Sequence, residues 1–260
     1  MTLNQIDEYF RSFLKIEEYP ADILQNGIQI ENSSPEKKEI QKIAFAVDAC
    51  EQTALEAAKE GADLLFVHHG LFWGHEKTIT GCHYKRIAAF IKNDLALYAC
   101  HIPLDANETV GNNFGLAFKL GLTQLEKFAS WRGMTLGVKG ILSEPLSVKE
   151  ISEKLFTQSN LSKSQAEPLL LSFGKDKCTR VGIISGGAGD EVVQAVDAGL
   201  DCFITGEIGH ENYHVAKEGK INVISAGHYA TETIGVNLVI AKVEKELGLQ
   251  TVFLDFPTGL

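Results

Sequence analysis

Short apolar runs alternate with helically periodic segments along most of this sequence, and this pattern constrains the fold most strongly. The apolar runs are expected to form buried strands at residues 43–47, 64–67, 95–99, 181–184, 202–204, 223–224 and 251–254. Apolar residues recur at helical spacing at residues 51–60, 84–92, 114–120, 192–198, 210–217 and 231–246. Strands that alternate with helices form βαβ units around a mostly parallel sheet, with ligands at the carboxyl ends of the strands. The pattern therefore predicts an α/β protein.

The two halves of the chain contain similar segments. Gly61-Ala62-Asp63-Leu64-Leu65-Phe66 aligns with Gly199-Leu200-Asp201-Cys202-Phe203-Ile204, and each begins with a helix exit followed by an Asp-led strand. An internal duplication explains this match, and so does chance similarity between two ordinary βαβ units. If the halves are duplicates, two facing α/β layers leave a cleft where their strand ends meet. Polar stretches at 143–145 and 157–164 are expected to be loops between the halves.

Composition limits the partners of the chain. Its 260 residues include 24 Lys and Arg against 34 Asp and Glu, which gives a net charge of −10. An acidic surface repels nucleic acids and anionic membranes, and the sequence contains no apolar run of membrane-spanning length. The N-terminus lacks the pattern of a signal peptide, and the five cysteines include no C-x-x-C pair. We therefore expect a cytoplasmic protein that binds neither nucleic acid nor membrane.

Three polar clusters follow predicted strands or open a predicted helix. His68 and His69 end the apolar run at 64–67, and metal ions are the commonest partners of neutral buried imidazoles, although a hydrogen bond within the core also satisfies a histidine. The second cluster is His101-Ile102-Pro103-Leu104-Asp105, in which Asp105 is either a metal ligand or a turn cap. The third places His228 and Glu232 four residues apart on one helical face, either as ligands of one site or as an exposed polar pair.

A fourth cluster offers a rival interpretation. His210-Glu211-Asn212-Tyr213-His214 follows Glu207 and matches the H-E-x-x-H pattern of zinc metalloproteases, with Glu232 as a possible third ligand. This interpretation leaves His68, His69 and Asp105 without a role. The nearby Gly186-Gly187-Ala188-Gly189-Asp190 joins a strand to a helix. Its backbone N–H groups, at Gly187 and Gly189 in particular, either bind a substrate anion or form a tight β-to-α turn.

Three strings occur together in one order along the chain. They are His68-His69-Gly70-Leu71-Phe72-Trp73, His101-Ile102-Pro103-Leu104-Asp105 and Gly227-His228-Tyr229-Ala230-Thr231-Glu232. The set resembles the dinuclear-metal family of GTP cyclohydrolase I type-two homologues, also called NGG-interacting-factor-three-like proteins. Thr205-Gly206-Glu207, the turn at Gly186 and Asn26-Gly27 fit the same pattern, so the resemblance spans almost the whole chain. The chain departs from the family at Gly70, where proline is frequent, and at Gln25, where an acidic residue is common.

The resemblance implies a fold and a metal site. The expected fold is two similar three-layer α/β/α units per chain with mostly parallel sheets and the metal site in the cleft between them. We expect residues 1–126 plus 228–260 in the first unit and residues 127–227 in the second. The implied ligands of two divalent ions are His68, His69, Asp105, His228 and Glu232, with Glu232 bridging both ions. His101 would orient Asp105 or bind a water or the substrate, and the subunits would form homohexameric rings.

The implied ligands favour hydrolysis. Three imidazoles and two carboxylates suit Zn, Mn, Fe, Ni or Co, and a pair of such ions lowers the pKa of water at neutral pH. We therefore predict a metal-dependent, GTP cyclohydrolase-like hydrolase that attacks a C–N or phosphoester bond of a nucleotide-like substrate. The alternatives are a non-catalytic metal-binding ring that acts as a scaffold or regulator, and the H-E-x-x-H metalloprotease.

Overall fold

The chain forms two compact α/β units. The computed structural model describes residues 1–75, 77–157 and 167–260, so the predicted loop at 157–164 lies almost wholly outside the described residues. One unit comprises Met1–Leu104 with Val236–Phe256, and the other comprises Asp105–Gly235 with Pro257–Leu260. These bounds differ from the expected 1–126 plus 228–260 and 127–227. Residues from about 105 to 126 pack with the second sheet instead, and helix α9 (His228–Leu247) contributes residues to both units.

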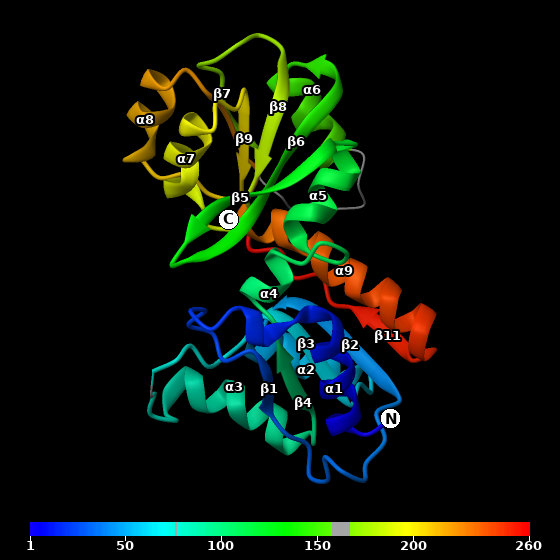
Figure 1. The fold of residues 1–260 in the computed structure, drawn as a ribbon. Coiled ribbons are helices and arrows are strands. Elements are labelled where there is room, and N and C mark those ends of the chain that lie inside the picture. The colour runs from blue at the N-terminus through cyan, green and yellow to red at the C-terminus, as the bar shows by residue number, and fades with distance from the viewer. Residues whose placement is uncertain (76, 158–166) are drawn as a thin grey trace. The chain divides into compact units, whose positions relative to one another are not determined.

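The first unit contains a five-stranded sheet with the strand order β1-β4-β3-β2-β11 (Figure 1). The strands are β1 (Gly27–Ile30), β2 (Lys42–Asp48), β3 (Leu64–His69), β4 (Ala96–Ala99) and β11 (Gln250–Phe253). The helices are α1 (Leu3–Leu14), η1 (Ile16–Glu18), α2 (Glu51–Lys59), α3 (Gly81–Lys92) and the later part of α9, while α4 (Ile102–Asp105) ends at the unit boundary. All strand pairs are parallel except β1 with β4.

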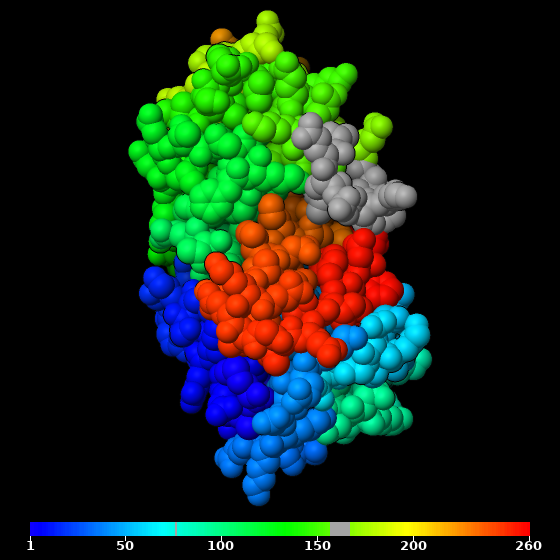
Figure 2. Space-filling view, turned by 90° about the vertical axis from the view of Figure 1, so that its right-hand side faces the viewer, coloured from blue at the N-terminus to red at the C-terminus, as the bar shows by residue number. Residues whose placement is uncertain are grey.

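Helices cover both faces of this sheet, because side chains of a strand alternate between its faces. In β3, Leu65 and Val67 belong to the core cluster that includes α2 and α3. Phe66 faces the other way and packs on Phe10 of α1, with ring centroids 5.0 Å apart. Helix α1 begins with a capping box formed by Thr2 and Gln5. In Figure 2 the orange-red α9 is exposed on the surface of the protein, and a hydrogen bond from Tyr9 to Glu246 links it to α1.

The second unit contains a six-stranded sheet with the strand order β5-β6-β8-β9-β10-β7. The strands are β5 (Thr123–Trp131), β6 (Met134–Leu146), β7 (Leu169–Leu171), β8 (Cys178–Ile183), β9 (Cys202–Thr205) and β10 (Asn222–Ser225). Strands β8, β9 and β10 are parallel, and antiparallel strands flank them on both sides. The β5–β6 hairpin was not predicted, and residues 143–145 lie in β6 rather than in a loop. The tight turn of this hairpin uses Arg132 and Gly133, whose φ angles are 50° and 81°.

Helices again lie on both faces of the sheet, as Figure 1 shows for α5 and α6 on one side and α7 and α8 on the other. They are α5 (Asn112–Leu120), α6 (Val148–Ser152), η2 (Glu153–Thr157), η3 (Gly189–Glu191), α7 (Val192–Asp197) and α8 (Asn212–Glu218). The predicted α/β class with two α/β units is thus confirmed. Among the described residues, no helix has both the length and the apolar character required to cross a bilayer.

Candidate metal centre

Three histidines meet at one edge of the first sheet. Strands β3 and β4 are parallel neighbours, so their carboxyl ends bring His68 and His69 close to His101. The ring centroid of His68 lies 4.5 Å from that of His69 and 5.1 Å from that of His101. One ring nitrogen from each of the three lies within 4.8 Å of the others. This edge therefore presents a compact group of potential metal ligands.

Hydrogen bonds at Nδ1 set the tautomers of these histidines. Nδ1 of the fully buried His68 lies 2.9 Å from the carbonyl oxygen of Cys100. A carbonyl only accepts hydrogen bonds, so Nδ1 carries the hydrogen and Nε2 keeps its lone pair, which is the form of imidazole that binds a metal ion. Nδ1 of His69 lies 2.9 Å from Oδ1 of Asp48 in the same arrangement. Acceptors at Nδ1 are typical of metal-binding histidines, because they orient the ring.

His101 is held by a buried carboxylate. Its Nδ1 lies 2.9 Å from Oδ1 of Asp22, whose side chain is only 1% exposed, and its backbone N–H donates to Oδ1 of Asn26. Burial would raise the pKa of Asp22, but hydrogen bonds from His101, Asn26 and the Leu24 N–H outweigh it and lower that pKa. Asp22 is thus an ionised anchor for His101. Sequence reasoning missed Asp22 and Asp48, because no spacing rule connects either to its histidine.

The second unit carries a group of carboxylates. Asp105 is buried, and its Oδ1 accepts hydrogen bonds of 2.9 Å from both Asn112 and Ser185. Ser185 follows β8, while Glu232 lies in the first turns of α9 and is only 2% exposed. A carboxylate oxygen of Asp105 and one of Glu232 lie within 4.8 Å of each other. Two buried carboxylates at this distance repel each other unless a cation or proton lies near them.

His228 supplies positive charge to this group. Its Nδ1 lies 2.5 Å from Oε1 of Glu207, and its Nε2 lies 3.2 Å from Oε1 of Glu232. Burial would lower the pKa of His228, but hydrogen bonds and charge interactions with Glu232 and Glu207 outweigh it and raise that pKa to about 9. The two carboxylates therefore stabilise the protonated, positively charged form of His228. The sequence places Glu207 before the H-E-x-x-H segment and in the Thr205-Gly206-Glu207 string, and the structure shows that it orients His228.

The glycine-rich turn after β8 packs against the same group. Gly186 has a φ of 66°, and its carbonyl oxygen accepts the N–H groups of Gly206 and Glu207. A Cβ at Gly186 would overlap Oε1 of Glu232, so only glycine allows this close approach.

Two further glycines of this turn remain predicted anion ligands that no observation tests. Gly187 lies beside His228 and Glu207, and Gly189 lies beside Asn212. The turn as a whole fits the tight β-to-α connection that was its other interpretation.

The H-E-x-x-H segment does not form a protease site. Helix α8 begins at Asn212, so His210 precedes the helix and does not share a helical face with His214. Both histidines are exposed, and in the described part of the chain neither belongs to a group of potential metal ligands. The metalloprotease interpretation is therefore not supported.

The implied ligands thus form two groups. His68 and His69 lie with His101 in the first unit, and Asp105, His228 and Glu232 lie in the second. Imidazole and carboxylate donors of this kind fit a borderline divalent cation such as zinc, manganese or iron. Fold and site together define a two-unit α/β protein with histidine and carboxylate groups suited to metal binding.

Comparison with known proteins identifies the family. The Duf34/NIF3 (NGG1p interacting factor 3) family profile matches residues 1–258, and the chain belongs to this family. A relative from Treponema pallidum is 41% identical, with 100% of both chains covered. Another from Deinococcus radiodurans is 42% identical over 99% of this chain and 94% of its own length. Both are named GTP cyclohydrolase 1 type 2 homolog, which confirms the resemblance found in the sequence.

Solved structures show the same fold. TTHA1606 from Thermus thermophilus is 37% identical, with a TM-score of 0.86 and 100% of both chains covered. The protein ybgI, described as of unknown function, is 30% identical with a TM-score of 0.89, again with 100% of both chains covered. Reduced HcgD from Methanocaldococcus jannaschii is 26% identical, with a TM-score of 0.83 and 98% of both chains covered.

Proposed function

We propose that this protein is a metal-dependent hydrolase that acts on a nucleotide-like substrate. Two divalent ions would be held by His68, His69, Asp105, His228 and Glu232, with Glu232 shared between them. The observation that carries the proposal is the tautomer of His68, whose Nδ1 donates to the Cys100 carbonyl from a fully buried position. A buried imidazole with a lone pair on Nε2, beside a second imidazole anchored in the same way, is suited to metal binding.

His101 and the carboxylates that hydrogen-bond to the histidines have supporting roles in this proposal. Asp22 and Asp48 orient His101 and His69, and Glu207 orients His228. When bound, a pair of divalent ions polarises the bond to be broken and activates water for attack. His101 would hold or transfer a proton at its Nε2, because Asp22 fixes its Nδ1.

The name shared by the relatives bears on which kind of bond is hydrolysed. Those proteins are named as homologues of a GTP cyclohydrolase, which favours a C–N bond of a purine-like ring over a phosphoester. We extend that chemistry to this chain as part of the proposal.

Elemental analysis of the purified full-length protein, followed by a hydrolase screen that includes GTP, tests the proposal. We expect two divalent ions per chain in the wild type, loss of metal in Asp105→Ala, and metal-dependent turnover that Asp105→Ala abolishes. A protein without metal would contradict the proposal outright. Full metal content without turnover of any nucleotide would instead favour a metal-binding scaffold or regulator.

We also propose that the chain acts in the cytoplasm as a homohexamer. All five cysteines lie in the described part of the chain and none of them forms a disulfide there, which suits a reducing compartment. Light scattering coupled to size-exclusion chromatography tests the assembly, and a monomer or dimer at micromolar concentration would contradict it.

A further inference from the structure

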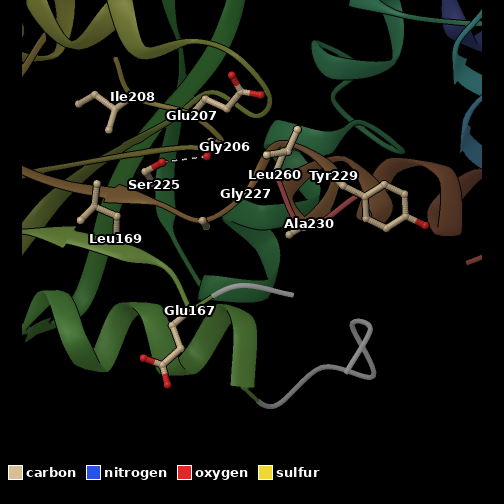
Figure 3. Close-up of a pocket in the computed structure, with 12 residues that line it drawn as sticks. Glu167, Leu169, Gly206, Glu207, Ile208, Ser225, Gly227, Tyr229, Ala230 and Leu260 are labelled. Carbon is tan, nitrogen blue, oxygen red and sulfur yellow. Dashed lines mark hydrogen bonds between the residues drawn. The ribbon is translucent and has the colours of Figure 1, made fainter. Parts of the chain in front are cut away.

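A cavity of about 370 Å³ opens in the second unit, at the carboxyl ends of β9 and β10 (Figure 3). Glu207 follows β9 and Gly227 follows β10, while Leu169 lies on the edge strand β7, where it pairs with Ser225 of β10. Gly227 and Tyr229 flank the candidate ligand His228, so the cavity adjoins the carboxylate group of this unit. Its volume lies within the range of small-molecule sites.

The walls combine small residues with apolar side chains. Small residues line much of the cavity, including Gly206, Gly227 and Ala230, and Leu169 and Ile208 add apolar surface. A side chain at Gly206 would approach the carbonyl oxygen of Gly186 to 2.7 Å, so larger residues cannot replace it without displacing the turn. The close contact of Gly206 with the turn at Gly186 is therefore fixed by the backbone.

The charged side chains among the described lining residues are all acidic. Glu167 and Glu207 line the cavity, and none of its described lining residues is Lys, Arg or His. The hydroxyl of Ser225 donates to the carbonyl oxygen of Gly206 at 2.9 Å, which leaves its oxygen as a further acceptor at the wall. Carboxylates repel phosphate groups but accept hydrogen bonds from ring N–H and amino groups.

We propose that this cavity binds the uncharged end of the substrate, a neutral heteroaromatic ring bearing N–H donors, and excludes phosphate groups. The inference rests on the proposed nucleotide-like substrate and adds its orientation, because the ring occupies the cavity while the phosphates lie outside it. The cavity is therefore selective for the base rather than for the phosphate chain.

Calorimetric titration of the chelator-treated, full-length protein tests this selectivity. The probes are guanosine, GMP and GTP, which share one ring and differ in negative charge. We expect guanosine to bind at least about tenfold more tightly than GTP, a difference of about 1.4 kcal/mol. Equal or tighter binding of GTP, or no binding of guanosine at millimolar concentration, would overturn the proposal.

Two matched pairs of variants locate the binding. Glu167→Lys should raise the affinity for GTP relative to guanosine, whereas Glu144→Lys makes the same charge change at an exposed residue outside the cavity lining and should not. Leu169→Trp should fill the cavity and weaken guanosine binding, whereas Val193→Trp should not, since Val193 is an exposed residue of α7 outside the lining. Equal effects within either pair would place the ligand elsewhere.

The result is independent of the proposed hydrolysis. Guanosine binding by a protein that contains no metal as purified, before any chelator treatment, would support the cavity and refute the hydrolase. The opposite result is metal-dependent turnover by the metal-loaded protein together with a preference of the chelator-treated protein for GTP. It would support the hydrolase and refute the proposal for the cavity.

Discussion

Asp63 and Asp201 occupy equivalent positions in the two units. Oδ2 of each carboxylate accepts hydrogen bonds from two consecutive backbone N–H groups at the start of the neighbouring strand. The donors are Gln41 and Lys42 for Asp63, and Thr179 and Arg180 for Asp201. The residue two positions before each aspartate is a glycine with positive φ, at 71° for Gly61 and 63° for Gly199. In both sheets an antiparallel edge strand precedes three parallel strands in the same order, which supports duplication over chance similarity.

Removal of either aspartate should destabilise the protein. Asp63→Ala and Asp201→Ala each leave two backbone donors without their carboxylate, at a cost of about 1–3 kcal/mol. The effect should be larger for Asp201, whose side chain is 6% exposed against 20% for Asp63. Urea unfolding followed by circular dichroism measures the loss, with the exposed Asp176→Ala as control. A loss no larger than that of the control would contradict the shared role.

The contribution of Asp201 to the free energy of unfolding should depend on pH. Burial would raise its pKa, but hydrogen bonds from Lys175 and the N–H groups of Arg180 and Thr179 outweigh it and lower that pKa below the ordinary value. A lowered pKa means that the carboxylate stabilises the fold above about pH 4, and that this contribution disappears as the pH falls through the folded-state value. We therefore expect the unfolding free energies of wild type and Asp201→Asn to differ at pH 7 and to converge below about pH 4. If the difference between the two unfolding free energies increased as the pH fell, the predicted stabilisation by the ionised Asp201 carboxylate would be contradicted.

Gly186 should be required for the metal group and not only for the turn. A Cβ at Gly186 would overlap Oε1 of Glu232, whereas a Cβ at Gly248 would meet no atom within 4 Å. The two glycines have nearly the same φ, 66° and 65°, so alanine imposes the same backbone strain of about 1 kcal/mol at each. Gly186→Ala should lower the metal content, and Gly248→Ala should change only the thermal unfolding midpoint. Equal metal content in both variants would show that metal binding does not require glycine at position 186.

The sequence predicted the positions of potential ligands better than their partners. His68 and His69 were correctly placed at the end of a buried strand, because an apolar run followed by two polar residues is a local signal. Asp22 and Asp48 were missed, since they meet histidines 79 and 21 residues away through tertiary contacts. The β5–β6 hairpin was also missed. Its Arg132-Gly133 turn is a weak signal, and the outer strand β5 is largely exposed, so it lacks a buried apolar run.

Asp22 and Asp48 form a matched pair for measuring what burial adds to histidine anchoring. Each lies 2.9 Å from Nδ1 of its histidine, but the Asp22 side chain is 1% exposed and the Asp48 side chain 38%. Asp22→Asn should cost about 1–3 kcal/mol of unfolding free energy, because several partly buried donors lose a charged acceptor. Asp48→Asn should cost less than about 1 kcal/mol. Urea unfolding compares them, and a larger loss for Asp48→Asn would show that burial does not set the strength of these anchors.

Glu232 should hold both ions, because a bridging carboxylate serves two cations at once. Its side chain is nearly inaccessible, and its oxygens lie near both Asp105 and His228, so no exposed residue can take its place without rearrangement. Glu232→Ala should therefore reduce the metal content from two ions per chain to none while the circular dichroism spectrum stays that of a folded α/β protein. The double variant His210→Ala/His214→Ala should retain both ions, since these exposed residues belong to no ligand group in the described part of the chain. Elemental analysis after dialysis distinguishes the outcomes.

Retention of two ions by Glu232→Ala would show that Glu232 does not bridge them. Loss of metal in the double variant would show that the H-E-x-x-H segment takes part in metal binding.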